Sequence, residues 1–278
     1  MALRQPPQLL SCVDSTNLYL SRQWDNNPHL PNFTSVVARH QSAGRGRLQR
    51  HWFAPAGTAL LQTTLLRLPT NTNPGWVPLL TGLAVLDLVV GSLLPPPTPI
   101  TLKWPNDVLF DARKGAGILG QVLQVASGPG TEHVLLVGVG LNLSQSRTQL
   151  CGLEAASLAT AGSVLVPGVP LQDRELQRWG AALNEHLNHR LQQSETEPQQ
   201  LQADYRHASA TLGSEVTATL VDGTTVCGRA VNVDADGHLQ IDAHDGQTLT
   251  VTAGDVSLGA PFLSDNTEIP FSTCEECQ

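Results

Sequence analysis

Aromatic residues and long apolar runs are scarce in this 278-residue sequence, and each shortage excludes a class of function. Aromatic side chains make up 4% of the chain, which leaves few platforms for stacking nucleic-acid bases. The longest apolar run, residues 79–94, is shorter than a membrane span and contains Asp87. The first residues lack the apolar segment of an export signal. We therefore expect a soluble, cytoplasmic protein that binds neither DNA nor membranes.

Cysteine usage supports the same location. The five cysteines are scattered along the chain without the spacing of a disulfide framework. Free thiols of this kind fit a reducing compartment. Cys274 and Cys277 form a C-x-x-C pair, which is half of a zinc site, and no nearby residue completes it. We expect no metal there.

Lysine is also scarce, because arginine takes nearly every basic position. Of the 16 basic residues only two, Lys103 and Lys114, are lysines. A lysine that persists in such a sequence is expected where a compact ammonium does something that a guanidinium cannot. Chance placement is the alternative. Because both lysines flank one motif, we interpret them as functional.

The positive charge that is present is concentrated in residues 39–52, although the net charge of the chain is −8. The arginines in this segment are Arg39, Arg45, Arg47 and Arg50. Between them, Gly44 and Gly46 allow the backbone to approach a ligand closely. The guanidinium groups of Arg45 and Arg47 suit carboxylate and phosphate oxygens. We interpret this segment, the arginine loop, as a loop around a small anion.

Residue patterns predict a larger α+β domain over residues 1–210. A helix is expected after the cap sequence at residues 14–17, and further helices at residues 76–94, 173–193 and 201–205. Pro95-Pro96-Pro97 should end the second helix, and Asp173 should cap the third. Strands are expected at residues 34–38 and 58–66, and residues 101–143 should form a meander of strands that includes residues 117–125 and 133–143.

After Gly213 the pattern changes to short alternating strands joined by Asp-Gly and Ala-Gly turns. The expected strands are residues 215–220, 226–233, 239–241, 248–252 and 255–258. Five strands in so short a segment predict a small SH3-like β-barrel. We place this second domain at residues 211–262 and a flexible tail at residues 263–278.

A second chemical motif is Lys103-Trp104-Pro105-Asn106-Asp107. Asn106 and Asp107 carry hard oxygen ligands, of the kind that hold Mg²⁺ beside a polyphosphate, although a β-turn with a capping aspartate is an equal alternative. Lys114 then precedes a glycine-containing strand that permits close ligand approach. No Ser/His/Asp or Cys/His arrangement stands out. These ingredients favour a site that brings two anions together, as the condensation of a carboxylate with ATP requires.

These motifs resemble those of biotin protein ligases. The matching segments are DSTN at residues 14–17, QSAGRGR at 41–47, KWPND at 103–107, KGAGIL at 114–119 and GVGLN at 138–142. The resemblance implies a class II synthetase-like biotin/lipoate ligase fold: a mixed sheet with flanking helices and the small barrel. It also implies a two-step reaction. Biotin and MgATP form biotinyl-5′-AMP, and the biotinyl group passes to a lysine of the biotin carboxyl carrier domain of a carboxylase.

The resemblance assigns roles residue by residue. The catalytic residues would be Lys114, Arg47 and Arg45. The biotin-binding residues would be Ser15, Thr16, Asn17, Gln41, Gly44, Arg45, Arg47, Trp52, Lys114 and Gly117. The ATP-binding residues would be Arg47, Arg50, Lys103, Asn106, Asp107, Lys114 and Asn142, with Asp107 and Asn106 holding Mg²⁺. A monomer or weak homodimer is expected.

Two departures from the family pattern matter. Some relatives stack a tryptophan on adenine after the GVGLN strand, but residues 145–163 contain no aromatic residue, so the nucleotide must be held differently. Bifunctional relatives carry an N-terminal winged helix-turn-helix, for which the position of DSTN leaves no room, so we expect no operator binding.

Two other functions stay open. A lipoate or octanoate ligase or transferase on a related scaffold also uses a lysine and a glycine-rich loop. The hydroxyls of Ser15 and Thr16, together with Gln41, favour a ureido head over an aliphatic chain. A nucleic-acid module that contacts phosphates through the arginine loop is disfavoured by the acidic charge and the few aromatics.

Overall fold

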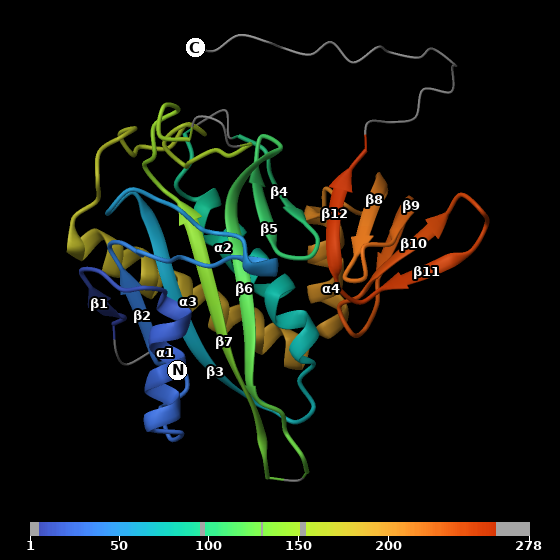
Figure 1. Ribbon diagram of the computed structural model, residues 1–278, viewed down its shortest axis with the longest axis horizontal. Coiled ribbons are helices and arrows are strands. Elements are labelled where there is room, and N and C mark those ends of the chain that lie inside the picture. The colour runs from blue at the N-terminus through green and yellow to red at the C-terminus, as the bar shows by residue number, and fades with distance from the viewer. Residues whose placement is uncertain (1–5, 95–97, 129, 151–153, 260–278) are drawn as a thin grey trace.

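The computed structural model describes residues 6–94, 98–128, 130–150 and 154–259. Two sheets form the framework (Figure 1): a seven-stranded sheet with strand order β1-β2-β3-β7-β6-β5-β4, and a five-stranded sheet with order β11-β10-β9-β8-β12. In the first sheet β1 and β2 are parallel and the other neighbours antiparallel, so the sheet is mixed. The expected α+β fold class is confirmed.

The larger sheet contains seven strands joined in part as a meander. They are β1 (Gln8–Leu10), β2 (Ser35–Ala38), β3 (Ala59–Pro69), β4 (Ile100–Lys103), β5 (Asp107–Phe110), β6 (Arg113–Gln124) and β7 (Glu132–Asn142). Strands β4 to β7 follow one another in space as in the chain, which confirms the predicted meander. The short β1 was not predicted. It pairs with β2 through only three residues, too few to leave an alternating pattern.

Helices cover the two faces of this sheet unequally. They are α1 (Thr16–Asn26), α2 (Val77–Val90), α3 (Asp173–Thr196) and α4 (Pro198–Ala208), with the 3₁₀ turns η1 (Arg47–Gln49) and η2 (Pro74–Trp76). Along β7, Val137, Val139 and Leu141 join the core under α2 and α3. Leu136, on the opposite face, packs with Leu20 of α1. Because α1 is short, it leaves the Asn142 end of this second face uncovered by a helix (Figure 1).

The helix boundaries differ from the predictions at three places. The helix expected at residues 76–94 begins at Val77, after η2, and ends at Val90 before Gly91; the proline run at residues 95–97 lies outside the described residues. The cap assigned to Asp173 was wrong. Gln172 is the N-cap, with its backbone N–H donating to Glu175 Oε2 at 2.7 Å, while Asp173 pairs with Arg39.

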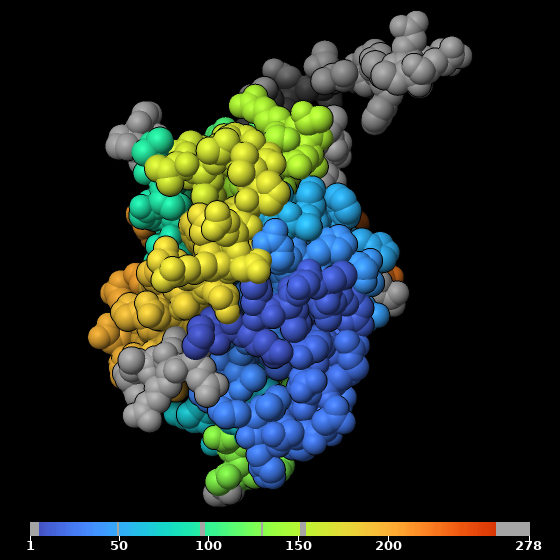
Figure 2. Space-filling model, turned by 90° about the vertical axis from the view of Figure 1, so that its left-hand side faces the viewer, coloured from blue at the N-terminus to red at the C-terminus, as the bar shows by residue number. Residues whose placement is uncertain are grey.

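Helix α4 spans Pro198–Ala208, longer than the predicted residues 201–205, because Pro198 starts it in the first turn, where a proline is tolerated. The Arg39–Asp173 pair and the bond from Leu171 N to Gly57 O attach the segment before α3 to the N-terminal strands. Figure 2 shows this junction, with the yellow segment against the blue N-terminal surface.

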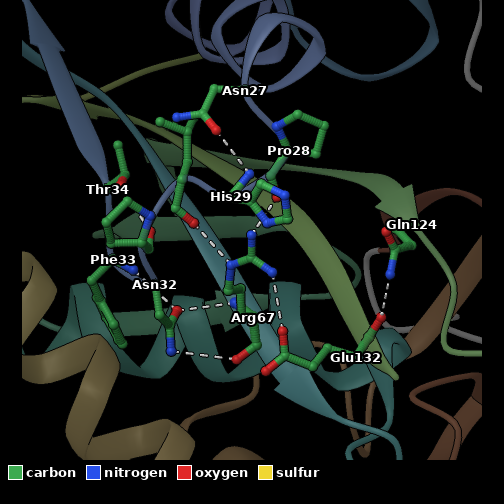
Figure 3. Close-up of polar contacts among 11 residues, drawn as sticks. Asn27, Pro28, His29, Asn32, Phe33, Thr34, Arg67, Gln124 and Glu132 are labelled. Carbon is green, nitrogen blue, oxygen red and sulfur yellow. Dashed lines mark hydrogen bonds and ion pairs between the residues drawn. The ribbon is translucent and has the colours of Figure 1, made fainter. Parts of the chain in front are cut away.

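Arg67 fixes the connection between α1 and β2 at the end of β3 (Figure 3). Its Nε donates to Leu30 O at 2.8 Å and its Nη1 to Glu132 Oε2 at 3.1 Å, and its guanidinium lies 5.2 Å from the centre of the Trp24 ring. The Asn32 side chain accepts from Arg67 N at 2.9 Å. These contacts hold α1 against the sheet and so fix the position of its N-terminus.

The second sheet confirms the five strands predicted for the C-terminal part. They are β8 (Glu215–Leu220), β9 (Thr225–Val233), β10 (Leu239–Ala243), β11 (Thr248–Val251) and β12 (Gly254–Leu258). All neighbouring pairs are antiparallel, and the buried side chains belong to the main core. Residues 263–278, with Cys274 and Cys277, lie outside the described residues.

Two tryptophans of the larger unit bind the turn between β9 and β10. Trp76 Nε1 donates to Asp234 O at 3.1 Å, and Trp104 Nε1 donates to Gly237 O at 3.0 Å. Both indoles are buried. The second sheet is therefore fixed to the first through specific hydrogen bonds as well as apolar contacts.

Among the described residues, no helix combines the length and the apolar character that crossing a bilayer needs.

Candidate active site

One cavity collects nearly all of the predicted site residues. Its volume is about 920 Å³, and it lies on the α1 face of the larger sheet, closed on one side by β12 of the smaller sheet. The predicted residues that line it are Ser15, Thr16, Asn17, Gln41, Arg45, Arg47, Arg50, Trp52, Lys103, Asn106, Asp107, Lys114, Gly117 and Asn142. Only Gly44, among the predicted residues, does not line it. A Cβ at Gly44 would lie 2.3 Å from Trp52 O, so this glycine shapes the arginine loop itself.

A chain of buried hydrogen bonds occupies the α1 end of the cavity. Gln41 Oε1 accepts from Thr16 N at 2.8 Å and from Thr16 Oγ1 at 3.0 Å. Thr63 Oγ1, on β3, lies 2.8 Å from Thr16 Oγ1 and 2.7 Å from Asn17 Oδ1. The network fixes several polar side chains at this end of the cavity. Sequence reasoning missed Thr63, because a threonine in a strand carries no signal of its own.

Glycines on β6 and β7 make room for side chains over the floor of the cavity. A Cβ at Gly138 would lie 2.1 Å from Asn17 Oδ1, and one at Gly140 would lie 2.5 Å from Trp52 Cε2. On the neighbouring strand, a Cβ at Gly117 would come within 3.0 Å of the same Trp52 ring. The GVGLN and KGAG segments therefore have glycines where the Trp52 indole and the Asn17 amide lie against the sheet.

Lys114 and Asp107 form an ion pair in the centre of the cavity. Lys114 Nζ lies 2.6 Å from Asp107 Oδ1 and 5.9 Å from the centre of the Trp52 ring. The backbone of Lys114 is fixed by two hydrogen bonds at 3.0 Å, from its N to Glu154 O and to its O from Ala156 N. The ammonium is thus held on a rigid strand, and only its side chain is free to change partner.

The arginine loop closes the cavity from the side of the smaller sheet. Arg47 donates to Asn106 Oδ1 at 3.3 Å and to Gly254 O at 3.0 Å, and it lies 3.7 Å from Asp255 Oδ1. Arg50 pairs with the same Asp255 carboxylate. Burial lowers the pKa of Arg47, an effect that the nearby Asp255 and Asp107 oppose. The guanidinium remains charged, because its ordinary pKa lies far above neutrality.

Arg45 differs from Arg47 and Arg50 in how its backbone and side chain are placed. Its backbone forms a bridge with His51, while its side chain is exposed and lines the cavity.

The contribution of Gly254 and Asp255 was missed by sequence reasoning, because they lie more than 200 residues after the arginine loop, in an ordinary strand.

Asn106 and Asp107 meet the chemical requirements of a Mg²⁺ site in part. Both line the cavity with oxygen atoms, and Asn106 is oriented by a hydrogen bond from its Nδ2 to Ile118 O at 2.9 Å. Their oxygens face the cations of Arg47 and Lys114. Mg²⁺ keeps several waters and phosphate oxygens as ligands, so one or two protein oxygens suffice to hold it.

Asn142 lies at the opposite end of the cavity from α1. Its Nδ2 donates to Ala156 O at 3.1 Å, and its Oδ1 accepts from Gln145 Nε2 at 2.8 Å. From Gly138 to Asn142, β7 advances roughly 13 Å, at about 3.3 Å per residue. The cavity therefore extends along at least this length of β7, from the polar network beside Gly138 to Asn142.

Comparison with known proteins agrees with this geometry. Residues 9–142 match the model of the biotin/lipoate A/B protein ligase family, and residues 211–259 match that of the biotin protein ligase C-terminal domain. The biotin–[acetyl-CoA-carboxylase] ligase of Mycobacterium tuberculosis is 38% identical, covering 80% of this chain and 77% of the relative. The bifunctional ligase/repressor BirA of Bacillus spizizenii is 26% identical over 84% of this chain and 68% of its own length.

The fold has solved counterparts. A biotin protein ligase from Aquifex aeolicus in complex with biotin and ATP superposes with a TM-score of 0.68 at 24% identity, covering 92% of this chain and 99% of that one. The matched segments, the M. tuberculosis relative and the shared architecture together establish that this chain belongs to the biotin protein ligase family.

Proposed function

We propose that this chain is a biotin–[acetyl-CoA-carboxylase] ligase with the residue roles given below. In the first step a biotin carboxylate oxygen attacks the α-phosphorus of ATP, an O–P bond forms, and pyrophosphate leaves. In the second step a lysine amine of the acceptor attacks the acyl carbon, an amide forms, and AMP leaves. The observation that carries this proposal is the convergence of Lys114, Arg47 and Arg45 on one cavity beside the buried Thr16–Gln41 network.

Lys114 and Arg47 provide the charge that this chemistry needs. Two anions must meet in the first step, and further negative charge develops on the phosphate oxygens. Lys114 would exchange Asp107 for the biotin carboxylate and the α-phosphate, since its side chain alone is free to move. Arg47, with Arg45 and Arg50 beside it, would turn from Asn106 and Gly254 to the phosphates. Trp52, between the arginine loop and the glycines of β6 and β7, would shield the reactive anhydride from water.

The polar network at the α1 end supports the ureido ring of biotin as its ligand. Ser15, Thr16, Asn17 and Gln41 supply hydroxyl and amide groups in a buried pocket, where a ring with both donors and acceptors satisfies them. Gly44 and Gly117 would let the loop and the strand approach the valeryl chain. Lys103 and Asn142 would contact the nucleotide.

Asp107 and Asn106 are the residues that would hold Mg²⁺. When bound, the ion would neutralise charge on the phosphates and orient the pyrophosphate leaving group.

The acceptor is a biotin carboxyl carrier domain, which would present its lysine at the open side of the cavity. We place the catalytic domain at residues 1–210 and the second domain at residues 211–262. The free thiols of Cys12 and Cys227 support a cytoplasmic location. We also propose that the chain is a monomer or weak homodimer that does not bind DNA.

A lipoate or octanoate ligase is the alternative function on this scaffold. The polar side chains of Thr16 and Gln41, fixed by Thr63, favour biotin, because an aliphatic chain offers no hydrogen bonds to the polar groups at this end of the cavity. Exchange of labelled pyrophosphate into ATP decides between the two. We expect exchange that depends on biotin and not on lipoate or octanoate; the opposite dependence would refute the proposal.

A further inference from the structure

Gln145 has an unused hydrogen-bond acceptor beside the cavity. The residue follows β7, lines the cavity and is 1% exposed. Its Nε2 donates to Asn142 Oδ1, whereas its Oε1 is buried and has no hydrogen-bond partner among the residues that the structure describes. A buried acceptor without a donor is destabilising, and a donor on a ligand removes this cost. No role of Gln145 follows from the family motifs quoted above.

The surrounding hydrogen bonds determine which way this amide points. Asn142 Nδ2 faces two backbone carbonyls, Ala156 O at 3.1 Å and Lys114 O at 3.4 Å, so the nitrogen of Asn142 must be on that side. Asn142 Oδ1 therefore faces Gln145, and Gln145 must present its nitrogen to it. Reversing the Gln145 amide would bring two oxygens together. The unpaired atom is consequently an acceptor, independent of the ambiguity between amide oxygen and nitrogen.

The position of Gln145 along the cavity indicates which part of the substrate it faces. The polar network with Thr16 and Asn17 lies beside Gly138, and both the Trp52 ring and the Lys114 ammonium lie at the paired Gly117 and Gly140, farther along β7. Gln145 lies beyond Asn142, at the end farthest from the network. If the biotin ring occupies the network and the phosphates meet Lys114, the purine base comes to lie at the Gln145 end.

We infer that Gln145 selects adenine by accepting a hydrogen bond from its 6-amino group, an inference that rests on the proposed ATP-dependent function. Guanine and hypoxanthine carry an oxygen at that position, which would face Gln145 Oε1 without a proton between them. This role requires the Gln145 side chain to turn its buried Oε1 toward the base while its Nε2 keeps the bond to Asn142. Residues 145–163 contain no aromatic residue that could stack on the base. The contact of Gln145 with the edge of the base would supply part of the recognition that stacking provides elsewhere.

Three nucleotides and three proteins test the inference. The substrates are ATP, purine riboside triphosphate, which lacks the 6-amino group, and inosine triphosphate, which has an oxygen there. The proteins are the parent, Gln145→Met and Gln149→Met. Gln149 also lines the cavity, but its Oε1 already accepts from Ser146 N at 2.9 Å, so it is a matched control. The measurement is kcat/KM for biotin-dependent pyrophosphate exchange.

In the parent and in Gln149→Met, we expect ATP to exceed purine riboside triphosphate by roughly 10- to 100-fold, and inosine triphosphate to be poorest. In Gln145→Met, ATP and purine riboside triphosphate should differ by about 2-fold at most, and the penalty against inosine triphosphate should disappear. A Gln145→Met protein that keeps the order of the parent would overturn the inference.

The nucleotide series within the parent decides the question even if Gln145→Met does not fold. Equal use of ATP and purine riboside triphosphate by the parent would overturn the role of Gln145 and leave the proposed function standing. Absence of biotin-dependent exchange with every nucleotide would instead overturn the proposed function, and the inference with it.

Discussion

Gly117 of β6 and Gly140 of β7 are directly paired across the sheet, and the indole of Trp52 lies over both. Because neither residue has a side chain, the surface of the sheet is flat there, and the ring packs against it. Trp52 in turn lies near Lys114 Nζ, so its placement affects the centre of the site.

Gly140→Ala should displace Trp52 while preserving the fold. The added Cβ would lie 2.5 Å from the indole, and the strand backbone cannot retreat because it is paired on both sides. We expect adenylate formation to fall at least about 10-fold, equivalent to about 1.4 kcal/mol of transition-state stabilisation. Single-turnover formation of biotinyl-5′-AMP measures this.

Gly120→Ala is the matched control. It adds the same group on β6, where the nearest atom is Pro78 Cγ at 3.5 Å, an ordinary contact. Equal losses in the two variants would show that strand glycines, and not the fit of Trp52, determine the rate.

Lys114→Ala should lower the rate of adenylate formation by several orders of magnitude without unfolding the chain. The ammonium is the central cation of the cavity, and its side chain is 37% exposed, so its loss leaves no buried cavity. Removing it also leaves the Asp107 carboxylate without its cation, which adds repulsion toward phosphate. Pyrophosphate exchange, together with circular dichroism to verify folding, is the measurement; near-normal exchange would remove the assigned role.

Thr63→Val should weaken biotin binding. The substitution conserves shape but removes the hydroxyl that bonds Thr16 and Asn17, and leaving such buried groups unpaired costs about 1–3 kcal/mol. We expect KM for biotin to rise roughly 10-fold or more, with a smaller effect on KM for ATP.

The next residue of β3 provides the comparison for that prediction. Thr64 points to the opposite face, where it bonds Asn184 of α3. Thr64→Val should lower the free energy of unfolding by a similar amount but leave KM for biotin unchanged. If both variants raised KM equally, the effect would be one of stability.

Asp255→Asn should loosen the arginine loop. This carboxylate pairs with Arg50 and lies 3.7 Å from Arg47, so it holds both guanidinium groups before a phosphate is present. We expect faster proteolysis of residues 45–50 in the ligand-free variant and faster escape of biotinyl-5′-AMP. The amount of free adenylate in rapid filtration measures the escape.

Asp222→Asn serves as the control for the charge change. Asp222 lies in a turn of the smaller sheet, where its side-chain oxygen accepts from Thr224 N at 2.9 Å, and asparagine retains that acceptor. The role of Asp255 would be refuted if proteolysis and adenylate escape were the same in Asp255→Asn, Asp222→Asn and the parent. Arg47→Ala should leak adenylate as well, because it removes the phosphate contact proposed for Arg47.

Much of the architecture was predictable, because strong local signals coincide with it. The buried helix α2, the meander up to β7 and the five C-terminal strands follow from apolar runs and glycine turns. The boundaries were less accurate. The cap of α3 was assigned to Asp173, yet tertiary pairing with Arg39 draws that carboxylate away, and Gln172 takes the cap position.

The site was predictable where a motif carried it and unpredictable where only folding assembled it. The cavity does gather Lys114, Arg47 and Thr16, each from a motif. Thr63 joins β3 to α1 through two hydrogen bonds between distant segments, Gln145 bonds Asn142 three residues earlier, and Asp255 lies on the other sheet. Such contacts leave no periodicity or composition in the sequence.

The hydrogen bonds from Trp76 and Trp104 to the turn after β9 limit where the chain of this enzyme can be truncated. Trp104 stands two residues before Asn106, so the same short segment lines the cavity and attaches the second sheet. Cutting the chain near residue 210 would leave two indole N–H groups without acceptors and expose the apolar surface around them. A C-terminal domain transplanted from another chain would therefore need carbonyl groups at both of these positions. An enzyme truncated near residue 210 should become insoluble before it loses the catalytic activity of its remaining part.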